Sequence, residues 1–461
     1  MPLTRRELLN GLWGVGAAAA LGLSPTAALA HCKQKLFVWR NWSGGQTCVP
    51  RHRLGPATEA ELAEQIRNAR HTVRPVGSGH SFSPLVPTDG SIVSLGGMTG
   101  MIDHNPETLE AEFWAGTRMS EMGAPLKEAG QALPNMADID YQTLAGAIST
   151  STHGTGVNHT SYSPHITGMR LVTASGEIMD LSAQSHPEVF HAAKVSLGAL
   201  GVITRVRMQN RKAFRLREHM WLQKTEELLE DIPRLVRDND HWEMQVITNS
   251  DYAAGISLNE TQDPITPVEE GADEGGNEYV YWIEKLDKYG SDWPAAQTAI
   301  LNMVAKTASF EDRVHDSYEI YANVRNIRFN EMEYEVPAED GPACLRKILK
   351  TIKDRDLPTW FPIEYRYVKG DDVPISMFEG RDSCAISIHQ HYTMDYHNYF
   401  AAVEPIFWEF GGRPHWGKLH NLNAAQLKSL YPRWQEFTDV RAALDPQGKF
   451  LNGHLRSVFG A

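Results

Sequence analysis

The stretch Val76-Gly-Ser-Gly-His-Ser-Phe-Ser83 places one histidine in a turn of glycines and serines, directly after the short strand expected in "TVRPV" (72–76). Glycines at 77 and 79 allow the main chain to approach a ligand closely and to adopt positive φ. The backbone amides and the hydroxyls of Ser78 and Ser81 can hold phosphate oxygens. No Gly-Lys-Ser/Thr follows, and the spacing differs from GxGxxG, so neither common nucleotide fingerprint applies. Taken alone, the turn is either a phosphate site or an ordinary turn.

A second run of small and hydroxyl-bearing residues, "AGAISTSTHGTG" (145–156), precedes a pair of expected strands. Two turns of this kind could hold the two ends of one long anionic ligand.

Composition sets outer bounds on the fold and on the partners. The 461 residues suffice for two or three domains with a full hydrophobic core. A formal net charge of −13 argues against nucleic acid as a partner, because phosphate binding needs basic clusters. The four cysteines form no CxxC pair and no zinc-ligand spacing.

The first thirty residues predict a signal for export. Residues 1–30 contain Thr4-Arg-Arg, a Gly/Ala-rich apolar core and a small-x-small end at Ala28-Leu-Ala30, which resembles a bacterial twin-arginine signal cleaved before His31. A membrane anchor is the alternative, but residues 11–23 are too few to span a hydrocarbon layer of about 30 Å. A periplasmic location follows, where Cys32 and Cys48 could pair, although their spacing does not require it.

The element pattern predicts an α+β chain. A helix over 58–70 precedes the glycine turn, strands follow at 91–95 and 110–116, and a helix is expected over 118–130. A hairpin over 166–182 and a strand within 198–210 end a first domain, 31–210. A second domain, 211–440, has longer aromatic strands, helices at 343–354 and 424–444, and an exposed acidic loop at 271–278; a tail, 441–461, follows.

Several ordered motifs together carry a resemblance to a known family. "RPVGSGHSFSP", "QTLAGAISTSTHGTG", "MRLVTASGEIMDLS" and "SLGALGVITRV" resemble the flavin domain of the vanillyl-alcohol-oxidase-type (PCMH-type) FAD superfamily. "EMEYEVP", "PIEYRYV", "HWGKLH" and "DPQGKFLNGHL" resemble its sugar-1,4-lactone oxidase and alditol oxidase branch. The resemblance runs from about residue 36 to the C-terminus. It implies a two-domain FAD-binding fold whose substrate domain is a large antiparallel sheet flanked by helices. It also implies oxidation of a lactone or alditol alcohol by hydride transfer to flavin N5.

The resemblance also assigns cofactor residues. In many members the histidine of Gly-Ser-Gly-His-Ser is bonded to the flavin 8α-methyl, which predicts covalent FAD on His80; contact without a bond is the alternative. His153 is expected to be structural, and Asn452 to return to the flavin from the tail. The implied cofactor-binding residues are Val76, Gly77, Ser78, Gly79, His80, Ser81, Ala137, Ala145, Gly146, Ser149, Thr152, His153, Gly154, Thr155, Gly201, Val202, Ile203 and Asn452.

Candidate catalytic residues come from the second domain. Glu364 and Arg366 alternate on one strand and so share a face, which indicates either an edge strand or a site. The resemblance makes this the catalytic face and adds Lys418. A cation near flavin N1 would stabilise its reduced form, Arg366 could also orient hydroxyls, and Glu364 could bind a hydroxyl or take its proton.

Two neighbouring patterns allow a weaker assignment. His389 and His391 also share a strand face; substrate contact by His389 is favoured over metal binding, since no third ligand is evident, and no metal is predicted. Glu333 is expected to be structural.

The electron acceptor stays open. The resemblance places Ala137 at a small residue beside the flavin that gates oxygen: glycine there accompanies oxidases, and alanine occurs in dehydrogenases and some oxidases. Asp138 departs from the serine common in related enzymes. A dehydrogenase acting on L-gulono- or galactono-1,4-lactone and using a quinone or cytochrome is therefore the alternative to an oxidase. Rivals of another class are a flavin-loaded sugar-binding protein without turnover and a flavin-free periplasmic binding protein.

Overall fold

The computed structural model describes residues 37–267, 298–299, 301–303, 306, 310–323, 327–359 and 361–461. The predicted signal (1–30), Cys32 and the acidic loop (271–278) lie outside these ranges. Residues Trp39–Ala461 form one compact unit. No helix within the described ranges has the length and hydrophobicity needed to cross a bilayer.

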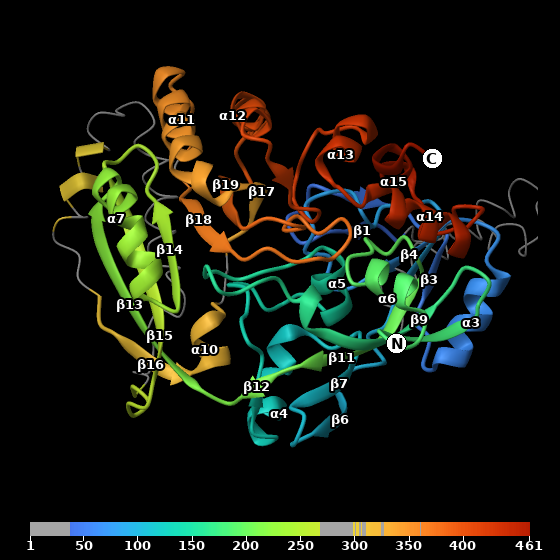
Figure 1. Ribbon diagram of the computed structural model, residues 1–461. Helices are drawn as coiled ribbons and strands as arrows, with labels where there is room; N and C mark the ends of the chain where they lie inside the picture. Colours follow the sequence, from blue (N-terminus) through green and yellow to red (C-terminus); the bar gives the residue numbers. More distant parts are fainter. Residues whose placement is uncertain are drawn as a thin grey trace, which may run out of the picture. The chain divides into compact units, whose positions relative to one another are not determined.

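The N-terminal part of this unit carries two sheets (Figure 1). A parallel sheet has the order β3 (His52–Leu54), β5 (Ser91–Ser94), β4 (Val73–Val76). An antiparallel sheet has the order β10 (Ile178–Ser182), β9 (Ile166–Val172), β11 (Val202–Gln209), β7 (Glu110–Trp114), β6 (Met101–Asn105). The predicted hairpin is confirmed, because β9 pairs with β10 around Gly176 at φ +77°.

Short helices and strand pairs complete this part. They are α3 (Glu59–Asn68), α4 (Gly123–Glu128), α5 (Leu144–Ser149), α6 (Pro187–Ala193), the pair β1 (Trp39–Arg40) and β2 (Thr47–Cys48), and the pair β8 (Gln131–Ala132) and β12 (Arg211–Lys212). Thr58 caps α3 by accepting the amide of Glu61 at 3.1 Å. The single helix expected over 118–130 is instead a 3₁₀ turn, Met119–Glu121, followed by α4.

The second part is one eight-stranded sheet in which every pairing is antiparallel, as predicted. Its order is β16 (Arg313–Asp316), β13 (Arg215–Lys224), β15 (Tyr252–Thr261), β14 (His241–Val246), β18 (Ile363–Val368), β19 (Ser383–His391), β17 (Phe329–Pro337), β20 (Arg413–Pro414).

Helices α7 (Thr225–Asp238), α11 (Gly341–Asp354) and α12 (His397–Glu409) pack on this sheet (Figure 1). The face that they cover is apolar: Tyr334 stacks on Phe407 of α12 with ring centroids 4.8 Å apart. The opposite face carries the charged residues and is free to form the site.

Helix α10 (Ser317–Tyr321) follows β16, and α13 (Ala424–Leu430), α14 (Trp434–Leu444) and α15 (Gly453–Phe459) end the chain. The prediction of one helix over 424–444 is wrong. Pro432 lies at the break between α13 and α14, where its missing amide hydrogen prevents a continuous ladder.

Candidate functional site

A cavity of about 1100 Å³ joins the glycine turn, the small-residue run and the uncovered face of the large sheet. This volume lies just above the usual range for small-molecule sites, about 300–1,000 Å³. Every residue predicted to bind the cofactor lines it except Asn452, as do Glu364, Arg366, His389 and Lys418. The structure therefore brings together candidates from across the chain.

The glycine turn is shaped by a close approach of two segments. A Cβ on Gly77 would lie 2.1 Å from Thr143 Oγ1, the N-cap of α5, so only glycine fits. Gly79 has φ +70°, in the left-handed region. Ser78 Oγ donates to the Tyr141 carbonyl at 2.5 Å, which ties this turn to the loop that enters α5.

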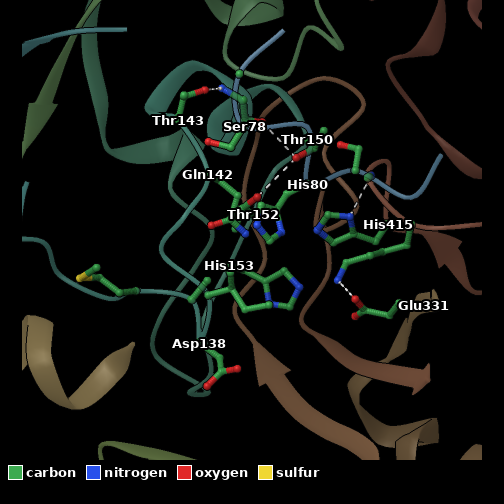
Figure 2. A pocket seen from close by; sticks show the side chains of 18 of the residues that line it. Ser78, His80, Asp138, Gln142, Thr143, Thr150, Thr152, His153, Glu331 and His415 are labelled. Atoms are coloured by element: carbon green, nitrogen blue, oxygen red, sulfur yellow. Dashed lines mark hydrogen bonds and ion pairs between the residues drawn. The ribbon is translucent and has the colours of Figure 1, made fainter. Parts of the chain in front are cut away.

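His80 lies in the cavity (Figure 2), and its ring stacks against Trp42 and Tyr141. It stacks on Trp42 with ring centroids 4.9 Å apart and planes 21° apart. Burial, and then the positive charge of Lys418, lower the pKa of His80 to about 4. The imidazole is therefore neutral near pH 7 and keeps a nitrogen lone pair.

Ala137 and Asp138 form the wall beside the small-residue run. The Ala137 amide donates to the Tyr162 hydroxyl at 2.8 Å, which fixes the backbone at this point. Asn323 donates its amide to Asp138 Oδ1 at 2.9 Å. The position that the resemblance assigns to oxygen access is thus rigid and lies on the cavity surface.

Strand β17 supplies a row of three buried carboxylates, Glu331, Glu333 and Glu335, each less than 3% exposed. Residues two apart on a strand share a face, so all three lie on the face of the sheet that forms the site. Glu331 and Glu333 line the cavity. Glu331 accepts a hydrogen bond from Ser387 Oγ at 2.9 Å and forms an ion pair with Lys418 (Figure 2). Both oxygens of Glu335 have no hydrogen-bond partner among the described residues.

Glu333 is the centre of the charge network. Its Oε1 accepts from Arg366 Nη2 at 3.0 Å and lies 2.9 Å from His153 Nε2, while its Oε2 lies 3.7 Å from Lys418 Nζ. Burial by itself would raise the pKa of Glu333, but Arg366 and His153 outweigh it and hold this pKa well below its usual range. Sequence reasoning favoured a structural role for Glu333, whereas the structure places it between the candidate catalytic cations.

Arg366 is 7% exposed and is anchored on two sides. Besides Glu333, its Nη2 lies 3.1 Å from Glu364 Oε2. Its Nε has no hydrogen-bond partner among the described residues. The guanidinium is therefore fixed in position on the wall of the cavity.

The pKa values of two site histidines are shifted in opposite directions. His389 Nδ1 faces the Pro362 carbonyl at 2.9 Å, and its Nε2 lies 3.4 Å from Glu331. Burial would lower the pKa of His389, but Glu331 outweighs it and the pKa is raised. Burial lowers the pKa of His415 to about 3. His391 contacts Thr393 Oγ1 at 2.7 Å and is not among the residues lining the cavity.

Three placements were not anticipated. Glu331 and His415 line the cavity although neither was a candidate. The alternation Glu-Met-Glu-Tyr-Glu does not by itself assign Glu331 to a site, since charged residues at every second position are also the pattern of a solvated strand face. Asn452 caps α15 and donates its amide to the carbonyls of Pro84 and Pro87, both at 2.9 Å, so it supports the loop after His80 from outside the cavity.

Comparison with known proteins agrees with this geometry. Residues 206–458 match the D-arabinono-1,4-lactone oxidase family, and residues 50–182 match the FAD binding domain family. The chain belongs to the D-arabinono-1,4-lactone oxidase family. The predicted family and the predicted enzyme class, an FAD-dependent oxidoreductase, are confirmed.

Several curated relatives match nearly the whole chain. L-gulono-1,4-lactone dehydrogenase of Mycobacterium tuberculosis is 37% identical over 92% of this chain and 99% of its own. L-gulonolactone oxidase of Bos taurus is 28% identical over 91% and 98%. Alditol oxidase of a Streptomyces species is 26% identical over 91% and 98%.

Among solved structures, a solvent-stable cholesterol oxidase superposes with a TM-score of 0.76 at 16% identity, over 92% of this chain and 97% of that one. The cholesterol oxidase of B. sterolicum gives 0.75 at 14% identity over 92% and 96%. These likenesses and the match to the FAD binding domain family confirm the predicted fold, and the likenesses say nothing about the substrate.

The cavity fits an FAD molecule in both size and chemistry. Glycine backbone and hydroxyls line one part, where a pyrophosphate would find donors, and small side chains at 137, 145 and 146 leave room for a flat ring. Arg366 and Lys418 supply positive charge on the opposite wall, where a reduced flavin would need it.

Proposed function

We propose that this protein oxidises an alcohol group of a sugar-1,4-lactone and transfers two electrons to FAD. The observation that carries the proposal is the pair of cations, Arg366 and Lys418, each ion-paired to a β17 carboxylate on the wall that faces the cofactor segments. The 37% identity to an L-gulono-1,4-lactone dehydrogenase supports the lactone over an alditol.

Bound FAD would supply the two-electron acceptor, because it takes the carbon-bound hydrogen of the alcohol as a hydride. Arg366 donates hydrogen bonds to the substrate hydroxyls. Glu333 and Glu364 both contact its Nη2 and orient the guanidinium, which leaves other N–H groups for the substrate. Glu364, with 16% of its side chain exposed, is the most accessible of the site carboxylates and accepts the hydroxyl proton. The alcohol R₂CHOH thus leaves as R₂C=O, with one hydride and one proton removed.

The flavin is attached covalently through His80 in this proposal. A neutral, buried imidazole that is stacked on Trp42 has the lone pair and the fixed orientation that a nucleophile needs. The twin-arginine pattern supports export of the loaded enzyme to the periplasm, because that route carries folded proteins.

The acceptor is proposed to be other than oxygen. Ala137, on a backbone fixed by Tyr162, stands where glycine accompanies oxidases, and the relative at 37% identity is named a dehydrogenase whereas the oxidases are 26–28% identical.

The test is anaerobic bleaching of the flavin absorbance by L-gulono-1,4-lactone, D-arabinono-1,4-lactone and alditols, followed by admission of air. Bleaching by a lactone and slow recovery in air are expected. Bleaching by alditols alone would overturn the substrate class, and recovery within the mixing time would make the protein an oxidase. A colourless protein would contradict the flavin itself.

A further inference from the structure

The cavity continues well beyond the charged cluster, along the half of the large sheet formed by β14, β15 and β13. Figure 1 shows these three strands side by side. Alternate residues of these strands point into it, as the two-residue period of a strand requires. We call this region the apolar arm; its residues are Met220, Leu222, Ile247, Ala254, Ile256 and Leu258.

The two halves of this sheet face differ sharply in chemistry. Strands β17, β19 and β18 present Glu331, Glu333, His389, Glu364 and Arg366 to the cavity. Strand β14, next to them, presents Glu243 and Gln245. Strands β15 and β13 present methyl, methylene and thioether groups, and the Glu218–Arg313 ion pair (2.6 Å) lies in β13 and β16 beyond them. A sugar lactone carries hydroxyls all round its ring, so its binding would use the charged half and leave the apolar arm empty.

The strand register fixes how far the arm reaches. Glu364 lies opposite Gln245, Gln245 opposite Ala254, and Ala254 opposite Leu222. At about 4.8 Å per strand, Leu222 lies about 14 Å from Glu364 across the sheet. A molecule that fills both regions therefore has a polar head and an apolar chain or ring system of about that length.

We propose that the apolar arm binds the tail of a quinone, the electron acceptor that reoxidises the enzyme. The inference rests on the proposed lactone oxidation. That proposal names the substrate that is oxidised but not the chemical class of the electron acceptor. A quinone head has two carbonyl oxygens, and Arg366 and Lys418 are the donors available at the charged end of the cavity. Its alkyl or isoprenoid tail gains from burial against Leu222, Ile256 and Leu258.

The overall step balances. The lactone gives up two electrons and two protons, and the quinone takes the same number: R₂CHOH + Q → R₂C=O + QH₂. The first half-reaction supplies the electrons and one proton as the hydride held by the reduced enzyme. The second proton is the one removed from the hydroxyl. Lactone and quinone use the charged end in turn, so the lactone product must leave before the quinone head enters.

The experiment measures how fast the reduced holoenzyme is reoxidised by two benzoquinones with the same head, one without a tail and one with a decyl tail. Dithionite reduces the enzyme anaerobically, so the result does not depend on whether the lactone is the true substrate. The decyl quinone is expected to react at least about tenfold faster at equal, subsaturating concentration. Equal rates for the two quinones would overturn the proposal.

Two variants locate the effect. Leu222→Asn, at a half-buried position in the arm, should remove most of the preference for the decyl quinone and leave the rate with the tail-less quinone within about twofold. Ile178→Asn, on the exposed strand β10, is the matched control and should keep the full preference. Loss of the preference in both variants would contradict placement of the tail in the arm.

The competing occupant is the apolar part of an amphipathic alcohol substrate. If alkyl-substituted lactones bleached the flavin at least about tenfold faster than free lactones while the quinones showed no tail effect, the arm would belong to the substrate and the quinone proposal would be wrong. Failure of every lactone to bleach the flavin would contradict the proposed function alone.

Discussion

Glu333 and Glu335, two residues apart on β17, should respond to the same substitution with opposite changes in stability. Glu333 contacts Arg366 and His153, and its pKa lies well below the usual range because its interactions with these two residues outweigh burial. Glu335 has no hydrogen-bond partner among the described residues; burial, and then the negative charge of Glu333, raise its pKa well above the usual range. The two pKa values are thus shifted in opposite directions: that of Glu333 is lowered and that of Glu335 is raised.

Glu333→Gln removes one partner of a buried ion pair, a change that costs about 3–5 kcal/mol. Arg366 keeps Glu364 at 3.1 Å, so the lower end, about 3 kcal/mol at pH about 7, is expected. A depressed folded-state pKa stabilises the fold above the unfolded pKa. This deficit should therefore shrink as the pH falls below about 4 toward the folded pKa.

Glu335→Gln should be neutral or stabilising. The pKa of Glu335 is raised in the folded state, so this residue ionises more readily in the unfolded chain. Its ionisation there lowers the free energy of unfolding by at most about 1.4 kcal/mol for each pH unit above about 4.3. The largest gain that Glu335→Gln could give is therefore about 4 kcal/mol at pH 7. Because burial of the new amide offsets part of this, we expect a gain of about 2 kcal/mol that grows with pH and vanishes near pH 4.3.

Urea unfolding of the holoenzyme, followed by tryptophan fluorescence between about pH 4 and 8, measures both effects. Glu107→Gln, in an exposed turn, is the control and should change the free energy of unfolding by less than about 0.5 kcal/mol. A Glu335→Gln protein as unstable as Glu333→Gln at neutral pH would refute the charge assignment.

Three further predictions concern the chemistry. Arg366→Lys should slow anaerobic flavin reduction by the lactone about 10²–10³-fold without loss of FAD. The reason is that a lysine ammonium cannot replace the planar guanidinium that Glu333 and Glu364 hold in place. Arg237→Lys, on the surface, should leave this rate unchanged. His80→Ala should yield protein whose flavin is released on acid precipitation, whereas the wild-type pellet stays yellow; flavin retained by the variant would exclude His80 as the linkage. Ala137→Gly should speed reoxidation by oxygen and leave reoxidation by quinone unchanged; an unchanged oxygen rate would remove Ala137 as the gate.

The parts of the site that depend on local chain chemistry could be predicted from the sequence. Glycines at 77 and 79 are dictated by a close approach and by a positive φ, which only glycine meets without strain, so the turn is visible in one stretch of residues. The alternation of Glu364 and Arg366 fixes their common face whatever the rest of the chain does. Helix boundaries such as the break between α13 and α14 depend on single residues that interrupt a helix. The prediction of one helix over 424–444 overlooked Pro432, which is visible in the sequence.

The carboxylate row could not be assigned in the same way, because its compensation is not local. On a strand, Glu331, Glu333 and Glu335 alternating with Met332 and Tyr334 have the pattern of a solvated face. The row is buried only because partners arrive from three distant positions: the cations Arg366 from β18 and Lys418 from the loop after β20, and His153 from the N-terminal half of the chain. None of these pairings leaves a spacing signal in the sequence. A buried charge needs partners of opposite charge. These partners come together only in the folded chain, so the sequence alone does not show that the row is buried. In the structure, the shifted pKa values of these carboxyl groups mark this part of the sheet as a candidate functional site.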